Sequence, residues 1–374
     1  MAASSVLNGG VFMPDFEAPR IAVLNLVYEG TDISADIAPY LLSFTYTDKA
    51  SGEADDIQIV LEDKDSRWIG NWFPNKGDTI NASITLFNWD KNNQNIKLPC
   101  GSFEIDEIEI SYPPTVVTIK GVSVLVTTSA VGQKKTTAWE SLNLKSIANE
   151  IAQKNNMKLF YDAALNPIYE RKDQVKTSDL TFLQNLCFDA GLAIKCTSSQ
   201  IVIYSEEEYE DKAPVATISK GDARIISVSL RSKTAGTYSK ANVAYHDPIV
   251  DETIEAEASS EDAPDNGKTL EINQRVKSQA EAESLAEEQL RQANKNEVSG
   301  RIDLTGLPNV VGGSVVVLSG WGKFDGKYFV ESAAHTYSES GYLVSIEINE
   351  TGASKGGKKA KNKKVSMQHE SLLS

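Results

Sequence analysis

The residues whose spacing first suggests a ligand site are three glycines near the C-terminus. Gly320, Gly322 and Gly326 form G-x-G-x-x-x-G, close to the glycine-rich loop that binds dinucleotide phosphates. That loop requires G-x-G-x-x-G and a following helix, whose first amides bind the pyrophosphate. The residues after Gly326, KYFVESAAHTY, are rich in aromatic and β-branched types and predict a strand instead. The sequence therefore favours a β-hairpin over a phosphate loop.

The predicted hairpin turns at Asp325-Gly326. An Asp-Gly pair between two strand-like runs is typical of a type I′ turn, because both central residues of that turn need positive φ. Gly320 and Gly322 then fall within the first strand of the hairpin, where glycine marks a bulge or a close approach of the backbone.

Histidine and cysteine are too few and too scattered for a metal site or a nucleophilic triad. The chain contains His246, His335, His369, Cys100, Cys187 and Cys196. No histidine pair has the spacing of a zinc motif, and the cysteines form no C-x-x-C. No nucleophile elbow is present either. We predict no metal, no cofactor and reduced, packed thiols, and we interpret His335 as a structural or interface residue.

Carboxylates and tryptophans leave two other kinds of site open. Glu104, Asp106, Glu107 and Glu109 lie on one predicted strand, where an acid pair could serve a glycosidase, but its regular apolar face indicates that they point to solvent. The tryptophans are Trp68, Trp72, Trp89, Trp139 and Trp321. They could form a sugar platform, yet in a β-rich chain we favour core or interface positions.

Charge separates the chain into regions. The formal net charge is −15, which argues against nucleic-acid binding, since phosphate contacts need a basic face. Residues 241–267 contain no Lys or Arg but do contain candidate docking acids, namely Asp251, Glu252, Glu255 and Glu257. A solvated loop is the favoured interpretation of this stretch, and a surface for a basic partner is the second. The last residues are instead basic, with Lys358, Lys359, Lys361, Lys363 and Lys364.

Membrane insertion is not expected from the hydropathy of the sequence. No apolar run approaches the roughly 18 residues of a spanning helix. The first twenty residues lack a basic segment followed by a long apolar core, so we also expect no signal peptide.

The N-terminal part of the chain predicts a curved antiparallel sheet or small barrel. Between about residues 21 and 128, strand-like segments alternate with turn-forming clusters. In FEIDEIEIS, the alternation of apolar residues slips by one position near Asp106-Glu107. A β-bulge produces such a slip and bends the strand.

The middle of the chain predicts a small α/β module. The segment from Leu144 places apolar residues on one helical face, with Asn143 or Ser141 as its cap. A second helix begins after Ser178 and stops at Gly191, where a left-handed residue is expected. Each helix leads into a short strand. The charged stretch EEEYEDKAP that follows, residues 206–214, is interpreted as a connector.

Strand patterns then return, interrupted by one long amphipathic helix. Ser278 and Glu281 form a capping box at its start, and it continues to Asn294. The chain is therefore mainly β (α+β), with residues 1–135 as a first β-domain, 136–212 as the inserted module, 213–351 as a second β-domain that includes helix 278–294, and 352–374 as a basic flexible tail. A solvated tail is the first expectation, and ordering on an acidic partner is the second.

Several segments together resemble the baseplate hub proteins of contractile tails, the phage late control protein D family. The matching segments, in order, are CGSFEIDEIEISYPPTVVTIKG from Cys100, LKSIANEIAQKNNMKL from Leu144, SDLTFLQNLCFDAGLAIKC from Ser178, RVKSQAEAESLAEEQLRQANKNEVSGRIDLTGLPNVVGGSVVVLSG from Arg275 and GKFDGKYFVESAAHTYS from Gly322. The resemblance covers roughly residues 20 to 350, and its specificity lies in the order of the segments.

This resemblance implies two tail-tube-like antiparallel β-barrel domains in one chain and a structural homotrimer without enzymatic activity. Such a trimer would adapt the sixfold tail tube to a threefold spike. The implied partners are the tail tube protein, a separate spike protein, other baseplate proteins and possibly the tape measure protein. The implied location is a virion or extracellular injection particle, after synthesis in the bacterial cytoplasm. The positions that match the family's C-terminal barrel hairpin are Gly320, Gly322, Phe324, Asp325, Gly326 and Tyr328.

Two other functions remain as alternatives. A carbohydrate-binding or adhesin-like β-protein of a tail tip would account for the strands and tryptophans, but it leaves the two helices of the module without a role. A cell-wall hydrolase would need an acid and a base in one cleft.

Overall fold

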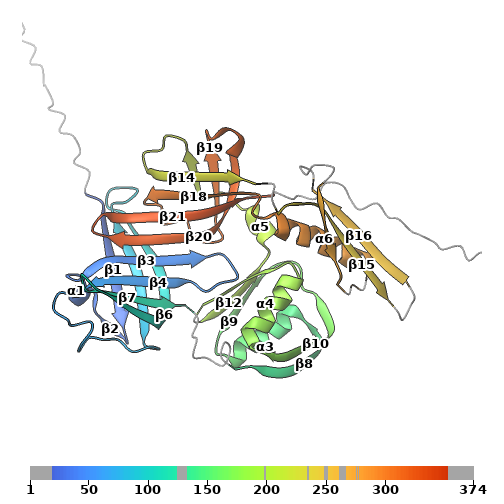
Figure 1. Ribbon diagram of the computed structural model, residues 1–374, viewed down its shortest axis with the longest axis horizontal. Coiled ribbons are helices and arrows are strands. Elements are labelled where there is room, and N and C mark those ends of the chain that lie inside the picture. The colour runs from blue at the N-terminus through green and yellow to red at the C-terminus, as the bar shows by residue number, and fades with distance from the viewer. Residues whose placement is uncertain are drawn as a thin grey trace, which may run out of the picture.

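The computed structural model describes residues 19–123, 133–197, 199–233, 236–247, 252–260, 267–274, 276 and 278–352 (Figure 1). The N-terminal region comprises β1 (Ile21–Tyr28), β2 (Thr31–Asp32), α1 (Ser34–Ile37), β3 (Leu41–Lys49), β4 (Asp56–Glu62), β5 (Thr79–Phe87), β6 (Asn95–Ser111) and β7 (Val116–Val122). Burial alternates along β4, β5 and β7, as expected for strands with one face on a core. The register shift predicted near Asp106-Glu107 is confirmed, since the pairing of β6 with β7 shifts between Ile105 and Glu107.

The middle region forms a compact module to the lower right of the N-terminal strands in Figure 1. Its elements are β8 (Lys135–Asn143), α3 (Leu144–Lys154), β9 (Lys158–Asp162), β10 (Ile168–Thr177), α4 (Asp179–Asp189), β11 (Ala193–Cys196), β12 (Gln200–Tyr204) and α5 (Glu206–Glu210). The predicted caps are confirmed, because the Asn143 side chain accepts from the Ser146 amide and Ser178 accepts from the Thr181 amide. Both helices bury their apolar faces in one cluster of side chains within the module.

The C-terminal region returns to strands. It comprises β13 (Ala216–Ser219), β14 (Ile225–Ser232), β15 (Tyr238–Asp247), β16 (Glu252–Ser259), β17 (Lys268–Ile272), α6 (Gln279–Asn294), β18 (Val298–Thr305), β19 (Val315–Ser319), the 3-10 turn η1 (Gly322–Phe324), β20 (Gly326–Ser338) and β21 (Gly341–Glu350). Within the described residues, no helix is long and apolar enough to cross a membrane.

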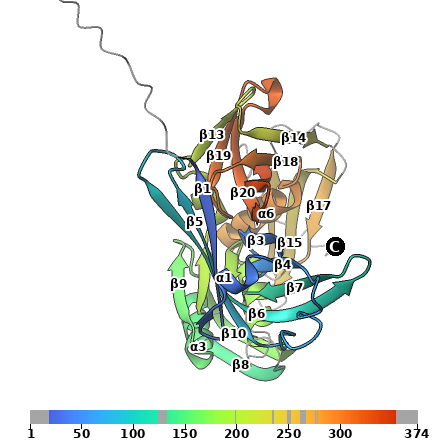
Figure 2. The same ribbon diagram turned by 90° about the vertical axis from the view of Figure 1, so that its left-hand side faces the viewer.

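One sheet of thirteen strands contains most strands of both β regions. Its order is β14-β18-β21-β20-β3-β4-β7-β6-β5-β1-β2, with β19 on β20 and β13 on β19. The two regions meet where β3 pairs with β20 in antiparallel register, from Ser43 opposite Ser338 to Lys49 opposite Ser332. Figure 2 shows β18, β19 and β20 above β3 and β4 at this seam. A single cluster of buried side chains extends across it and includes Phe44, Phe103 and Tyr328.

A smaller unit projects from the right of this body in Figure 1. It consists of the sheet β16-β15-β17 and helix α6, which packs on β15 and β16. Ser278 accepts a hydrogen bond from the Glu281 amide at the start of α6. The unit has its own buried cluster, which includes Val243, Leu285 and Leu290. Helix α6 therefore covers this unit and leaves the large sheet to other elements.

The C-terminal hairpin exists, but the predicted turn is wrong. Strands β19 and β20 pair from Val315 opposite Phe329 to Leu318 opposite Gly326. Gly326 is already a strand residue, with φ 159°, and Asp325 has φ −69°, so neither takes the conformation of a type I′ turn. The left-handed residues are Gly320 (φ 83°) and Gly322 (φ 71°), which lie in the connection after β19 and not in a strand.

Asp325 closes this connection with its side chain. Its carboxylate accepts a hydrogen bond from the Trp321 amide at 2.6 Å. The buried Tyr328 donates its hydroxyl to the Phe324 carbonyl at 3.0 Å. The aspartate that predicted a two-residue turn therefore stabilises a longer one, and the glycines shape the hairpin as expected but from its loop.

We predict that Gly322→Ala lowers the free energy of unfolding by about 1–2 kcal/mol, because an L-residue there must adopt a left-handed conformation. A Cβ at this position meets no atom within 4 Å, so the effect isolates the backbone dihedral. Denaturant unfolding measures it, with the exposed neighbour Lys323→Ala as the control. Equal stability of the two variants would contradict the assigned turn.

Candidate functional site: a buried ionic junction

The strongest concentration of buried charge lies where the module, the projecting unit and the large sheet meet. On the module side, Ser205 caps α5 by accepting a hydrogen bond from the Glu208 amide. The cap starts a short helix in which Glu206 and Glu210 stand one turn apart and are 3% and 8% exposed. The charged stretch at residues 206–214, interpreted from sequence as a connector, therefore buries two of its carboxylates.

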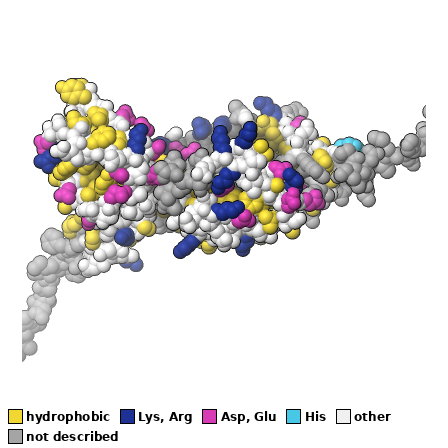
Figure 3. Space-filling view, turned by 90° about the horizontal axis from the view of Figure 1, so that it is seen from below, with side chains coloured by type: hydrophobic (Ala, Val, Ile, Leu, Met, Phe, Trp, Pro, Cys, Tyr) yellow, Lys and Arg dark blue, Asp and Glu magenta, His cyan; other side chains and the backbone are white. Residues whose placement is uncertain are grey.

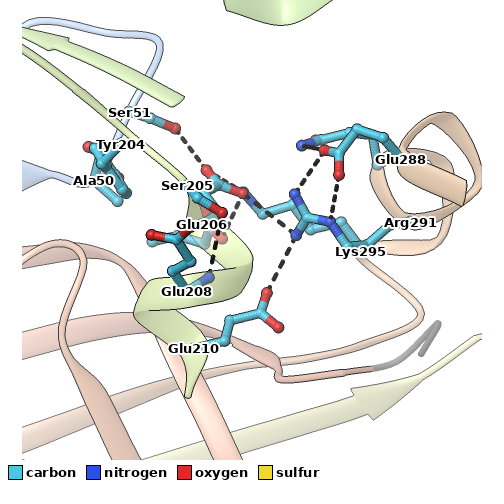
Figure 4. A network of polar contacts seen from close by, with 12 residues as sticks. Ala50, Ser51, Tyr204, Ser205, Glu206, Glu208, Glu210, Glu288, Arg291 and Lys295 are labelled. Atoms are coloured by element: carbon cyan, nitrogen blue, oxygen red, sulfur yellow. Dashed lines mark hydrogen bonds and ion pairs between the residues drawn. The ribbon is translucent and has the colours of Figure 1, made fainter. Parts of the chain in front are cut away.

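The cations come from the end of α6 and the residue after it. Lys295 contacts Glu206 at 2.9 Å and Glu331 of β20 at 2.9 Å. Arg291, one turn earlier, contacts Glu210 at 3.3 Å and Glu288 at 2.7 Å. Figure 4 shows Arg291 of α6 and Lys295, which follows the helix, extending toward the carboxylates of α5. Three separate parts of the chain thus share one network of charges.

A bulge in β20 supplies the carboxylate of the large sheet. The pairing of β20 with β21 shifts between Val330 and Ser332, and Glu331 is the residue that the shift leaves out. The backbone carbonyl of Glu331 accepts a hydrogen bond from Ala50 at the end of β3. A bulge turns a side chain out of the regular alternation of a strand. The side chain at this bulge, Glu331, contacts Lys295.

A second set of contacts fixes the module to the turn after β3. Lys195 of β11 pairs with Asp48 and, at 2.9 Å, with Asp55. Tyr204 donates its hydroxyl to the Ala50 carbonyl at 2.8 Å. Ser51 donates to Glu206 at 2.9 Å, which links this set to the first one. The turn between β3 and β4 is therefore bound to the module at several points.

The pKa values at the junction reflect a competition between burial and pairing. Burial raises the pKa of Glu206, but Lys295 and Arg291 outweigh it and hold this pKa below its ordinary value. Burial prevails at Glu331 and Asp48, so their pKa values are raised although Lys295 and Lys195 oppose the shift. Both lysines have raised pKa values, because the neighbouring carboxylates outweigh their own desolvation.

This arrangement joins three parts of the chain through paired charges. The carboxylates of Glu206, Glu210 and Glu331 face the cations of Arg291 and Lys295. Throughout the described ranges, no group of three His, Cys, Asp or Glu residues is placed to hold a metal ion. What the junction can do is fix the angle between module, projecting unit and sheet.

The predicted docking acids do not join this junction. Asp251 lies outside the described residues, and Glu252 begins β16. Glu255 and Glu257 are exposed on β16, where Glu257 pairs with Lys240 at 2.8 Å. The interpretation of this stretch as a loop is wrong over residues 252–259, which form a strand. The five lysines of the tail, Lys358, Lys359, Lys361, Lys363 and Lys364, also lie outside the described residues.

Other candidates take mostly structural positions. Asp106, Glu107 and Glu109 are exposed as expected, but Glu104 is 4% exposed, so the expectation that it points to solvent is wrong. Phe103 and Ile105 on either side of it are buried as well, so burial does not alternate over these three residues of β6. Trp68 and Trp139 are buried, Trp89 and Trp321 are half-buried, and Trp72 is 39% exposed. All three cysteines are free and buried.

His335 lies at the seam and is fully buried. It faces Tyr46 across the β3–β20 pairing, and its Nδ1 lies 2.7 Å from the Tyr342 hydroxyl. Its ring stacks on both tyrosines. Burial lowers the pKa of His335 to about 4. These contacts agree with the interpretation of this histidine as structural.

The junction itself was missed from sequence. Its local signal was present, since Glu206 and Glu210, like Arg291 and Lys295, are spaced four residues apart and so share one face of a helix. Such a pair predicts a charged helix face but not its partner. Lys295 and Glu206 are 89 residues apart in the chain.

We predict that Lys295→Met lowers the free energy of unfolding by about 3 kcal/mol, because two buried carboxylates lose their cation. Lys64→Met is the matched control, since Lys64 pairs with Glu62 at 2.7 Å on the surface and its removal should cost no more than about 1 kcal/mol. Chemical denaturation of both variants at neutral pH measures the difference. Equal losses would show that the junction contributes no more than a surface pair.

We also predict that acid weakens the seam through His335. Its folded-state pKa of about 4 lies below the usual 6.5, so between these values the unfolded chain binds more protons and stability falls as pH falls. The loss amounts to roughly 3 kcal/mol by pH 4. The variant His335→Gln has no imidazole to titrate. Between pH 7 and pH 4 its free energy of unfolding should therefore fall less than that of the original chain, by the amount that His335 contributes. Parallel stability curves for the two proteins would contradict the prediction.

Comparison with known proteins links this fold to phage tails. No family model matches the chain. A probable baseplate hub protein of Escherichia phage P2 is 26% identical over 223 residues, which are 58% of this chain and 55% of that protein. The corresponding protein of Escherichia phage 186 is 26% identical over 178 residues, 47% of this chain and 43% of that protein. The matches thus span about half the length of these relatives.

Similarity in fold to solved structures covers more of the chain than the sequence similarity does. The 43 kDa tail protein of prophage MuSo2 from Shewanella oneidensis matches with a TM-score of 0.68 at 14% identity, over 89% of this chain and all of that one. A tail protein of Neisseria meningitidis matches with a TM-score of 0.67 at 13% identity, over 89% and 97%. The E. coli c3393 protein, a type VI secretion component, matches with a TM-score of 0.52 at 9% identity, over 84% and 75%.

The resemblance expected from the sequence is confirmed by these matches. In sequence the chain is similar to the probable baseplate hub proteins of phages P2 and 186, and in fold it is similar to phage tail proteins and a component of type VI secretion.

Proposed function

We propose that this protein is a structural baseplate hub of a contractile tail or related injection particle. In this proposal it assembles as a homotrimer and adapts the sixfold tail tube to a threefold spike. The observation that carries the proposal is the sequence similarity to probable baseplate hub proteins, together with the tail-protein fold over most of the chain. The trimer and the adaptor role go beyond that similarity and rest on the presence of two β regions in one chain.

The adaptor role follows from two β regions in one chain. If each region forms a tube-like domain, three copies present six similar surfaces to a tube while remaining a threefold object for a spike. The two regions are joined by the β3–β20 ladder and by a common buried cluster, so they would move as one body. Such rigidity suits a part that transmits force between a tube and a spike.

An exposed aromatic cluster supports a subunit interface. Between β4 and β5, Ile69, Trp72 and Phe73 are 44%, 39% and 46% exposed. Arg67 lies over the Trp72 ring at 5.0 Å. Asp63 accepts hydrogen bonds from the amides of residues 67, 68 and 69, which holds the loop in one conformation. A rigid, exposed aromatic group is typical of an interface anchor.

In Figure 3, apolar side chains gather on the left part of the molecule, whereas Lys and Arg side chains are more prominent at the centre and right. In the proposed particle, the partners are further copies of the chain, the tail tube protein, a separate spike protein, other baseplate proteins and possibly the tape measure protein. The chain would reside in the tail baseplate and have no enzymatic activity.

We expect the purified chain to be a homotrimer, with more than about 2,000 Å² buried at each interface, as obligate assemblies have. Light scattering measures the mass of the assembly, and a particle map counts the copies in the ring. Monomers at all concentrations, or six copies in the ring, would contradict the proposal.

The aromatic cluster gives a sharper version of this test. Trp72→Glu should dissociate the trimer. The monomer should stay folded, although it loses the edge contacts of Trp72 with Tyr40 and Trp68. Phe188→Glu, at a 59% exposed phenylalanine of the module, is the matched control and should leave the trimer intact. A stable trimer of the Trp72 variant would place the interface elsewhere without removing the hub.

A further inference from the structure

The α/β module has one open sheet edge. Its three-stranded sheet has the order β11-β12-β9, so β9 pairs on one side only. Lys158 donates its amide to Ser199, and the Asp162 carbonyl accepts from Ser205, so these residues face β12. Backbone groups of successive strand residues point to opposite sides. Leu159 and Tyr161 therefore direct their amides and carbonyls away from β12, where the described part of the chain offers them no partner strand.

A groove runs beside this open edge. It has a volume of about 470 Å³ and lies between two elements. Lys145, Ser146 and Asn149 of α3 form one wall, and Leu159, Phe160 and Tyr161 of β9 form the other. A helix beside an open strand is the arrangement in which an extended peptide adds a strand to a sheet and places alternate side chains against the helix. Phe160, 48% exposed, offers apolar contact on the strand side.

The charge around the groove selects the kind of peptide. Lys145 lies over the Tyr161 ring at 5.6 Å, which places its ammonium group beside the strand. Among the described residues, no carboxylate forms an ion pair with Lys145 or Lys158. An acidic side chain on an added strand would meet an unpaired lysine.

We propose that the open edge of β9 binds an extended, acidic peptide segment of another protein, which adds to the sheet beside α3. The backbone groups of Leu159 and Tyr161 supply the hydrogen bonds. Lys145 forms an ion pair with an Asp or Glu of the peptide, and Ser146 and Asn149 provide further polar contacts. The proposal concerns the module alone and does not depend on the trimer or the spike.

The test begins with a displayed library of random ten-residue peptides, selected on the immobilised full-length protein. We expect enrichment of sequences with an acidic residue among alternating apolar ones. The selected peptide should bind Lys145→Glu at least about tenfold more weakly, because like charges then face each other. This variant should fold normally, since an acidic residue is favoured in the first turn of a helix. Lys134→Glu, an exposed lysine of the same module outside the groove, is the matched control and should bind as the original does.

Residue-resolved hydrogen exchange then locates the peptide. Its binding should slow exchange at the amides of Leu159 and Tyr161, while Lys158 and Phe160, which already face β12, should change little. Methylating the backbone nitrogens of the peptide should abolish binding, because the added strand then loses its hydrogen-bond donors. A peptide held by charge alone would still bind after methylation.

Three outcomes would overturn the proposal. The first is that no selected peptide binds the original chain more tightly than it binds Lys145→Glu. The lysines would then only protect the open edge from pairing. The second is protection at other amides. The third is protection of Leu159 and Tyr161 in the assembled protein before any peptide is added, which would assign the edge to a second copy of this chain.

Discussion

The pairing of β3 with β20 is the interaction on which the rest of the structure depends. These strands come from opposite ends of the chain, and Thr45 and Thr336, whose hydroxyls lie 3.2 Å apart across the seam, are separated by 291 residues. Closing so long a loop costs conformational entropy, but the cost grows only slowly with length. The ladder and the common core of both β regions offset it. The chain between the two strands supplies most of the other strands of the large sheet, the module and the projecting unit.

One edge of β20 serves two strands in succession. Its first residues pair with β19, and from Ser332 onward the strand pairs with β3. Glu331 stands at the change of partner. The close approach there leaves little space, since a Cβ on Gly312 would lie 2.7 Å from the Ala50 amide. The ionic junction is built beside this change of partner, where Lys295 contacts both Glu206 and Glu331.

The junction is better understood as a device for specificity than for stability. Desolvating several carboxylates and cations is expensive, and buried ion pairs are often no better than apolar contacts of the same volume. Their value is that a wrong arrangement leaves charges unpaired. With Lys295 bound to both Glu206 and Glu331, rotation of the module relative to the sheet would separate at least one pair. For a part that must hold neighbours in register, such a penalty is useful.

The sequence by itself determined those features that depend on neighbours along the chain. The caps at Asn143 and Ser178, the buried faces of α3 and α4 and the register shift in β6 all follow from periodicity and local hydrogen bonding, which act within a few residues. The order of segments also sufficed to indicate a resemblance to baseplate hub proteins. These signals are local or collinear, so no knowledge of the folded chain was needed to use them.

Only the tertiary structure decided which distant groups would meet. Asp325 and Gly326 fit a type I′ turn locally, yet the turn is longer because β20 already begins at Gly326. Glu104 alternates like an exposed residue but is buried, and the acidic stretch at residues 252–259 is a strand because β15 lies beside it. The partners of Glu206 and Lys295 come from other elements, and a charge pattern specifies the sign of a partner but not its place. That place is set by the strand pairing that closes the fold.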